Sequence, residues 1–173
     1  ARVQAWEAAW DEWRREQVTA LVRRVAVQAR ALRPGIKITA AVFPDPDDAR
    51  ESRLQDWARW LREGLLDAAV IMAYATEPQV VRAQVRKALA VAGGRHVYAG
   101  LGAYRIWYLP GQVAEMIRQV REESPHGFVL FSFNEVATYF PFFETLAREV
   151  LQVPAAVPPM PWLAPSGRPA PPG

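Results

Sequence analysis

The chain has 173 residues, of which 51% are hydrophobic and 23% are charged, a composition typical of one globular domain. It contains no cysteine, which excludes disulfides and thiolate metal sites, and no run of about 18 apolar residues that would predict a membrane span. The net charge of +3 comes mainly from arginines scattered over the expected helices. No phosphate loop, zinc-finger spacing or RNA-binding motif accompanies them, so we expect no nucleic-acid partner.

Helical and strand patterns alternate along the chain. Four short apolar runs predict strands at residues 36–43 (IKITAAVF), 66–74 (LDAAVIMAY), 96–104 (HVYAGLGAY) and 127–133 (GFVLFSF). Their centres are spaced by about 30 residues, the length of a β-α repeat. None alternates between apolar and polar residues, which is typical of a buried parallel sheet. These features predict an α/β fold of parallel repeats.

Five helices with a period of 3.6 residues are expected around these strands. Their apolar stripes are Val18, Leu21, Val22, Val25 and Leu32; Leu54, Trp57 and Leu61; Val81, Val85 and Leu89; Val113, Met116, Ile117 and Val120; and Phe143, Leu146 and Val150. Residues 52–55 (SRLQ) fit a capping box for the second helix, and Pro78 and Pro110 suit first helical positions. Trp6, Trp10 and Trp13 recur at helical spacing, so we expect them to be packing residues.

The longer and more polar connections follow the strands, at residues 44–51, 75–77, 105–109 and 134–138. In parallel α/β folds the loops after the carboxyl ends of the strands carry the ligand, so any site is expected there. From residue 153 onward the chain is rich in proline, and we expect an extended linker or tail over residues 153–173 after a domain at residues 1–152. The stretch around Trp162 has the alternative of docking on the domain or on a partner.

Several ordered motifs resemble the bacterial glycosyl hydrolase-like 10 family. WDEWRREQVTALV (residues 10–22) is similar to the helix after the fourth barrel strand in that family, and AAVFPDP (40–46) to the end of its fifth strand. QDWARWLREGLLDAAVIMAY (55–74) resembles the run into its sixth strand, and YAGLGAYR (98–105) and GFVLFSF (127–133) resemble its seventh and eighth strands. The resemblance covers about residues 6–150.

This resemblance implies the C-terminal half of a TIM-type (β/α)₈ barrel that acts on a polysaccharide or glycan and is extracellular or in the cell envelope. A complete barrel needs about 250 residues. The sequence opens at Ala1 inside a helical pattern, so we expect a fragment whose first four strands lie upstream. The Asp-rich segment that the family carries after its fourth strand is missing here, so an incomplete active site is expected. The exposed edges of a half barrel also predict self-association.

Glycoside hydrolysis usually needs two carboxyl groups. Glu135, Asp45 and Glu77 follow predicted strands and are the candidate catalytic residues, although each could instead be a carboxylate that stabilises a helix N-terminus or a turn. Further candidates for contacts with the sugar are Tyr74, Tyr104, Trp107, Asn134 and Asp56, against packing or first-turn roles. His96 and His126 lie at strand starts, away from these positions, so we expect neither a metal site nor a cofactor.

Two readings compete with a hydrolase. A barrel that keeps the aromatic cleft but lacks the acid pair would bind glycans without cleaving them. A stand-alone parallel α/β binding module would be favoured by a glycine-rich phosphate loop after the first strand, but that loop is Phe43-Pro44-Asp45-Pro46. The sequence leaves both alternatives open.

Overall fold

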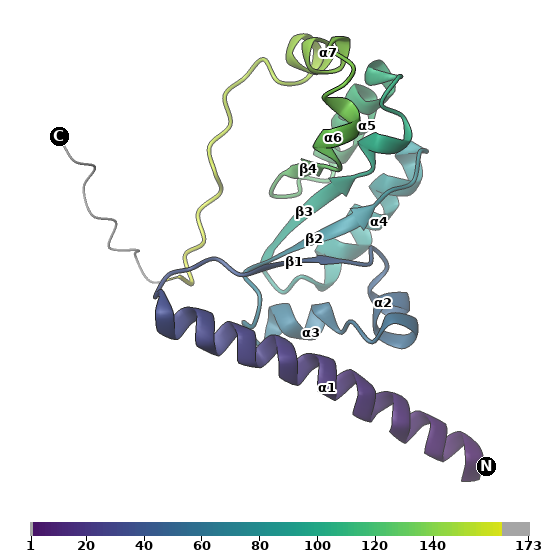
Figure 1. The fold of residues 1–173 in the computed structure, drawn as a ribbon, viewed down its shortest axis with the longest axis vertical. Helices are drawn as coiled ribbons and strands as arrows, with labels where there is room; N and C mark the ends of the chain where they lie inside the picture. The colour runs from purple at the N-terminus through teal and green to yellow at the C-terminus, as the bar shows by residue number, and fades with distance from the viewer. Residues whose placement is uncertain (1, 164–173) are drawn as a thin grey trace, which may run out of the picture.

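The fold is built on a parallel sheet of four strands. The computed structural model describes residues 2–163. The strands β1 (Thr39–Val42), β2 (Ala68–Ala73), β3 (His96–Leu101) and β4 (Phe128–Leu130) lie in the order β1-β2-β3-β4 (Figure 1). All three neighbouring pairs are parallel. The predicted α/β class and the sequential parallel order are confirmed, and the sheet is consistent with half of a TIM-type barrel.

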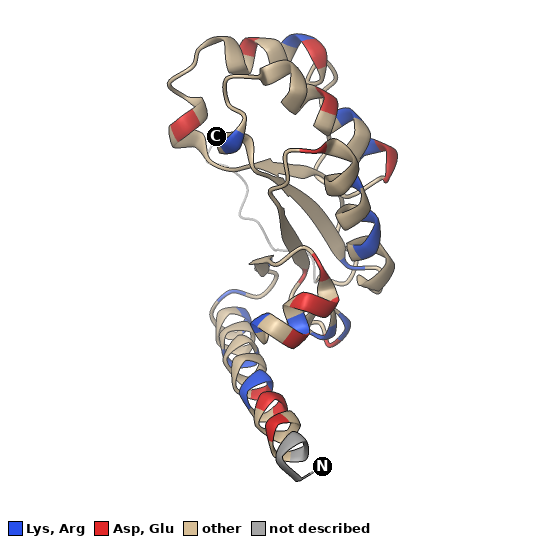
Figure 2. Ribbon diagram, turned by 90° about the vertical axis from the view of Figure 1, so that its right-hand side faces the viewer, with Lys and Arg blue, Asp and Glu red and all other residues tan. Residues whose placement is uncertain are grey.

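Helices cover one face of this sheet. The helices α4 (Pro78–Val91) and α5 (Pro110–Glu122) pack against it, and Figure 2 shows the charged residues on helices and connections while the strands carry none. Ile71, Val97 and Leu101 are fully buried on the helical face, whereas Val70 and Met72 on the opposite face are only half-buried. Successive strand residues point to opposite faces, so this alternation identifies the covered side.

The packed face of the long helix α1 (Arg2–Leu32) overlaps the predicted apolar stripe only in part. Thr19 and Ala26 are buried, and the Trp60 indole donates a hydrogen bond to the Thr19 hydroxyl at 2.9 Å. Leu21 and Leu32 of the predicted stripe are exposed. Small and polar residues let α1 approach the neighbouring helix α3 (Trp57–Arg62). Val18 and Val22 of the stripe are half-buried and pack against the core.

The expectation that the three N-terminal tryptophans are packing residues is wrong. Trp6 is 75% exposed and Trp10 and Trp13 are more than half exposed. Trp10 and Trp13 stack on each other with ring centroids 4.9 Å apart. The sequence spacing places them on one face of α1, but no element of residues 6–163 buries them.

Two predicted loops contain short helices, and the predicted capping box is wrong. Residues 46–53 form α2 (Pro46–Arg53), which Asp45 caps by accepting from the amides of Asp47 and Asp48. Helix α3 therefore starts later than expected, with Asp56 as its N-cap. After β4, the second predicted loop contains α6 (Phe133–Val136). Pro78 and Pro110 do occupy the first turns of α4 and α5, as predicted.

The remaining elements end the chain. The short 3₁₀ helix η1 (Ala103–Arg105) follows β3, and α7 (Pro141–Glu149) packs against α5. Residues 151–163, which we call the C-terminal strap, then run without helix or strand back toward the end of α1 (Figure 1). The rest of the proline-rich segment lies outside the described residues.

Candidate functional site

Three aromatic rings meet at the carboxyl ends of β2, β3 and β4. Tyr74 and Phe131 stack with ring centroids 5.4 Å apart and an interplanar angle of 9°. The edge of Tyr104 meets both of them, at 5.9 Å from Tyr74 and 5.8 Å from Phe131. We call these three residues the aromatic rim. Because parallel strands end at the same edge of a sheet, residues about 30 positions apart in the sequence become neighbours here.

Backbone contacts fix the position of the rim. The Phe131 amide donates to the Leu101 carbonyl at 2.9 Å, and the Tyr104 amide donates to the Phe131 carbonyl at 3.0 Å. Gly102 lies so close to Tyr74 that a Cβ added to it would be 2.9 Å from the Tyr74 Cβ. Glycine is required at this position because any side chain would displace the tyrosine.

Polar groups surround the rings. The Arg105 guanidinium donates to the Tyr74 carbonyl at 2.9 Å, which holds a cation beside the rim. Burial, followed by the proximity of Tyr104, raises the pKa of the Tyr74 phenol, which therefore stays protonated at neutral pH. A protonated phenol can donate a hydrogen bond as well as accept one.

A second aromatic group lies beyond η1. The Trp107 ring meets the edges of Tyr108 and Tyr139, each at a centroid distance of 5.7 Å. Trp107 is 36% exposed, so part of its surface remains available to a ligand. The contact with Tyr139 also gives Trp107 a packing role.

Glu135 and Asn134 belong to α6, directly after the rim. Both side chains are exposed, and the Ser132 hydroxyl donates a hydrogen bond to the Glu135 carboxylate. The peptide bond between Phe131 and Ser132 is cis. Glu135 thus lies four residues after Phe131 of the rim, on a short helix that begins shortly after β4.

Glu77 lies between Tyr74 and α4. Its carboxylate accepts from the Thr76 hydroxyl at 3.0 Å, and this hydrogen bond, with a smaller contribution from Arg105, lowers its pKa. Although Glu77 is the N-cap residue of α4, its side chain makes no capping hydrogen bond. The carboxylate is therefore ionised at neutral pH and suited to act as a base rather than as an acid.

Asp45 and Asp56 have structural contacts. Asp45 caps α2 and binds the ammonium group of Lys87 on α4 at 2.8 Å, which lowers the pKa of its carboxyl. Asp56 caps α3, accepts from the Arg59 amide at 3.2 Å and lies 3.5 Å from Arg50. The contacts of these two carboxylates are thus with the helical layer.

A family model described as glycosyl hydrolase-like 10 matches residues 2–120, more than half of the chain. The chain belongs to the glycosyl hydrolase-like 10 family. Comparisons with curated proteins and with solved structures gave no match. The family assignment confirms the resemblance seen in the sequence and supports a glycoside hydrolase-like protein that interacts with glycans.

The match to the glycosyl hydrolase-like 10 family ends within α5. Tyr74, Tyr104 and Glu77 lie inside the matched segment, whereas Phe131 and Glu135 lie beyond it. The expected resemblance of residues 127–133 to the family's last strand is therefore not covered by the match, although β4 pairs with β3 in parallel.

Sequence reasoning missed three residues of this site, Arg105, Phe131 and Ser132. Arg105 directly follows the predicted strand at residues 96–104. Phe131 and Ser132 were placed inside the predicted strand at residues 127–133, whereas β4 already ends at Leu130. The stacking of Phe131 on Tyr74 depends on the strand register, which the sequence does not provide.

The described residues were compared with two further features, a metal-binding cluster and a membrane-spanning helix. The described part of the chain contains no cluster of three or more His, Asp or Glu side chains that could hold a metal ion. Within residues 2–163, no helix combines the length and apolar character that crossing a membrane requires. His96 begins β3 and His126 precedes β4, at the opposite end of the strands from the aromatic rim, as predicted.

Proposed function

We propose that the chain binds a polysaccharide or glycan across the aromatic rim and takes part in its hydrolysis by carboxylate acid/base catalysis. The observation that carries this proposal is the meeting of Tyr74, Tyr104 and Phe131 at the carboxyl ends of three adjacent strands. In barrels of this class the loops at these strand ends form the active site. The family assignment supports the glycan as the ligand class.

The rim has the chemistry that sugars require. Aromatic rings can stack on the apolar face of a sugar ring, and the phenol groups can bond to its hydroxyls. Phe131 is 49% exposed and Tyr104 is 37% exposed, so the cluster has ring surface available to a ligand. Arg105 adds a fixed donor beside Tyr74. Trp107 and Asn134 extend the proposed binding surface on either side.

Hydrolysis would use two carboxyl groups about 5 Å apart for retention, or roughly 6.5–9.5 Å apart for inversion. We assign the general acid to Glu135, whose carboxylate is next to the rim and is contacted by the Ser132 hydroxyl. Glu77, which is ionised, is the proposed second carboxylate, in the role of base. Asp45 is the third candidate, although its contacts give it a capping role.

Binding can be tested by electrophoresis of the chain in gels that contain soluble β-glucan, xylan or glycol chitin. The Tyr74→Ala and Tyr104→Ala variants should weaken retardation by about tenfold, which corresponds to about 1.4 kcal/mol. Trp6→Ala removes a more exposed aromatic residue on α1 and should have no effect. If the three variants behave alike, or if none of the polysaccharides retards the chain, the rim is not the glycan-binding site.

Catalysis can be tested by release of reducing ends from whichever polysaccharide the chain binds. The variants are Glu135→Gln, Glu77→Gln and Asp45→Asn, with Glu115→Gln as an exposed control on α5. A catalytic acid should lose far more than tenfold in turnover, and each tenfold loss is about 1.4 kcal/mol of transition-state stabilisation. If none of the three loses more than tenfold, the assignment of these carboxylates is refuted.

Non-catalytic glycan binding is the second candidate. It is favoured by the helix-capping contacts of Asp45 and Asp56, because a carboxylate held by backbone amides is poorly placed to exchange protons with a substrate. It predicts that the Tyr74→Ala variant loses binding while no polysaccharide is cleaved. The two assays therefore separate the two functions.

A further inference from the structure

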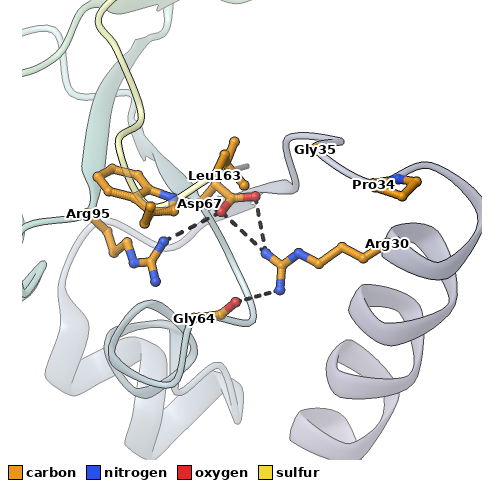
Figure 3. Close-up of a pocket in the computed structure, with 8 residues that line it drawn as sticks. Arg30, Pro34, Gly35, Gly64, Asp67, Arg95 and Leu163 are labelled. Carbon is orange, nitrogen blue, oxygen red and sulfur yellow. Dashed lines mark hydrogen bonds and ion pairs between the residues drawn. The ribbon is translucent and has the colours of Figure 1, made fainter. Parts of the chain in front are cut away.

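A fully buried carboxylate lies at the other end of the strands. Asp67, directly before β2, has no solvent exposure. One of its oxygens, Oδ2, accepts from the Ile38 amide at 2.8 Å and from Arg30 at 3.2 Å. Figure 3 shows Arg30 and Arg95 reaching Asp67 from opposite sides. Burying a carboxylate costs several kcal/mol unless its oxygens are paired, so each of these contacts matters.

The C-terminal strap supplies a further donor to Asp67. The Trp162 indole N–H donates to Oδ1 of Asp67 at 2.9 Å, although 95 residues separate the two in the sequence. Among the described residues, the other partners of Oδ1 are Arg30 at 3.3 Å and Arg95 at 3.6 Å. The indole is therefore the closest partner of this oxygen.

Two other side chains hold the indole ring. The Arg95 guanidinium lies over the Trp162 ring, 4.5 Å from its centroid, and the His96 ring meets it nearly perpendicularly at 5.1 Å. Cation–π contacts are strongest with tryptophan among the aromatic side chains. The site thus complements an indole in three ways. Asp67 accepts from its N–H, the Arg95 cation lies over its ring, and the His96 ring meets it nearly perpendicularly.

The first part of the strap, residues 151–157, contacts the domain weakly. Val153 is 81% exposed and Val157 is 74% exposed, and residues 151–157 are all exposed. The strap is thus a tether, and its attachment is concentrated near its end, where Trp162 contacts Asp67 and the Pro159 backbone accepts a hydrogen bond from His96. A pocket of about 330 Å³ lies beside the indole and is lined by residues that include Arg30, Gly35 and Leu163.

We propose that Asp67, Arg95 and His96 form a binding site for a tryptophan-bearing extended segment, and that Trp162 of the same molecule occupies it. The strap then closes the amino-terminal ends of β2 and β3 and ties the end of α7 to the connection between α1 and β1. This site lies at the opposite end of the strands from the aromatic rim and does not depend on the proposed glycan function.

Hydrogen exchange of the indole N–H groups, followed by NMR, tests this binding site. The Trp162 signal is assigned by its loss in the Trp162→Phe variant. We expect its N–H to exchange at least tenfold more slowly than that of Trp6, which is 75% exposed in the same chain and serves as the internal reference. Equal exchange rates for the two indoles would overturn the proposal.

Variants of the site test which residues hold the ring. Asp67→Asn removes the charge and Arg95→Met removes the cation but keeps an apolar stem, and both should accelerate the Trp162 exchange severalfold. Arg95→Met is the safeguard if the Asp67 variant fails to fold. Arg148→Met, on the exposed surface of α7, is the matched control and should change nothing. If Arg95→Met behaves like this control, Arg95 does not hold the ring and the proposed site is wrong.

Protein concentration distinguishes an intramolecular strap from one exchanged between copies. If the strap binds within its own molecule, the protection of the Trp162 N–H should be constant when the chain is diluted about twenty-fold, because a tether fixes the local concentration. Loss of protection on dilution would show that the strap of one copy occupies the site of another, and would overturn the intramolecular assignment.

Discussion

A pair of neighbouring substitutions in β2 tests whether helices cover only one face of the sheet. Ile71 is fully buried on the face that α4 and α5 cover, and Met72 points to the opposite face, where it is half-buried. Both residues pair with β3 in the same register. Their replacement by alanine therefore differs mainly in the burial of the side chain that is removed.

The expected magnitudes follow from that burial. Ile71→Ala removes the apolar carbons beyond Cβ from a fully buried position, which costs about 2.4 kcal/mol at about 0.8 kcal/mol per buried CH₂ group. The cavity left behind raises the typical cost of such a change to about 2–5 kcal/mol. Met72→Ala removes a side chain that water already reaches, so we expect about 1 kcal/mol. In a chain of this size, 1 kcal/mol lowers the melting temperature by about 2–4 °C.

Thermal unfolding followed by circular dichroism measures both effects. At about 3 kcal/mol, within that range, Ile71→Ala should lower the melting temperature by roughly 6–12 °C and Met72→Ala by roughly 2–4 °C, provided that each transition is two-state. Equal and large losses would mean that the open face is buried in solution, for example against a second copy. That result would refute one-sided packing of the sheet.

Three further predictions concern local features. Asp45→Ala should lower the unfolding free energy by about 1 kcal/mol through loss of the α2 cap, and Asp45→Asn, which keeps a capping oxygen, by much less. Gly102→Ala should displace Tyr74 and weaken polysaccharide retardation as Tyr74→Ala does; unchanged retardation would contradict the rim geometry. Burial lowers the pKa of His96 and of His126 below 6.5, so the unfolded state binds protons first. Stability should therefore fall as the pH drops below about 6.5, and a double substitution to glutamine should flatten this dependence in thermal unfolding.

The sheet could be predicted from the sequence because its signal is local. Each strand is a short apolar run, and the runs recur at the spacing of a β-α repeat. The face of α1 that packs could not be predicted in the same way. Its buried residues include Thr19, whose hydroxyl accepts from Trp60, a contact between positions 41 residues apart. Apolar periodicity identifies the most hydrophobic stripe, and here the stripe and the packed face share only Val18 and Val22.

The candidate site was predictable to the extent that it depends on strand ends. Tyr74 and Tyr104 were expected at one rim and do meet there, because parallel strands end at one edge. The contacts of the acids were predictable only in part. The capping of α2 by Asp45 has a local signal, because an Asp directly before a Pro suits the start of a helix. The pairing of Asp45 with Lys87 depends on how α4 packs.

In the aromatic rim, the backbone fixes where Phe131 lies and the side chain provides ring surface. Phe131 lies beyond the segment that matches the family, yet its amide and carbonyl join it to Leu101 and to Tyr104. These hydrogen bonds involve the main chain only, so they hold for most side chains at position 131. The ring itself is 49% exposed and contributes mostly surface. A change at this position would therefore alter which ligand the rim can hold at little cost in stability, since the backbone that positions it is already fixed by β3 and η1.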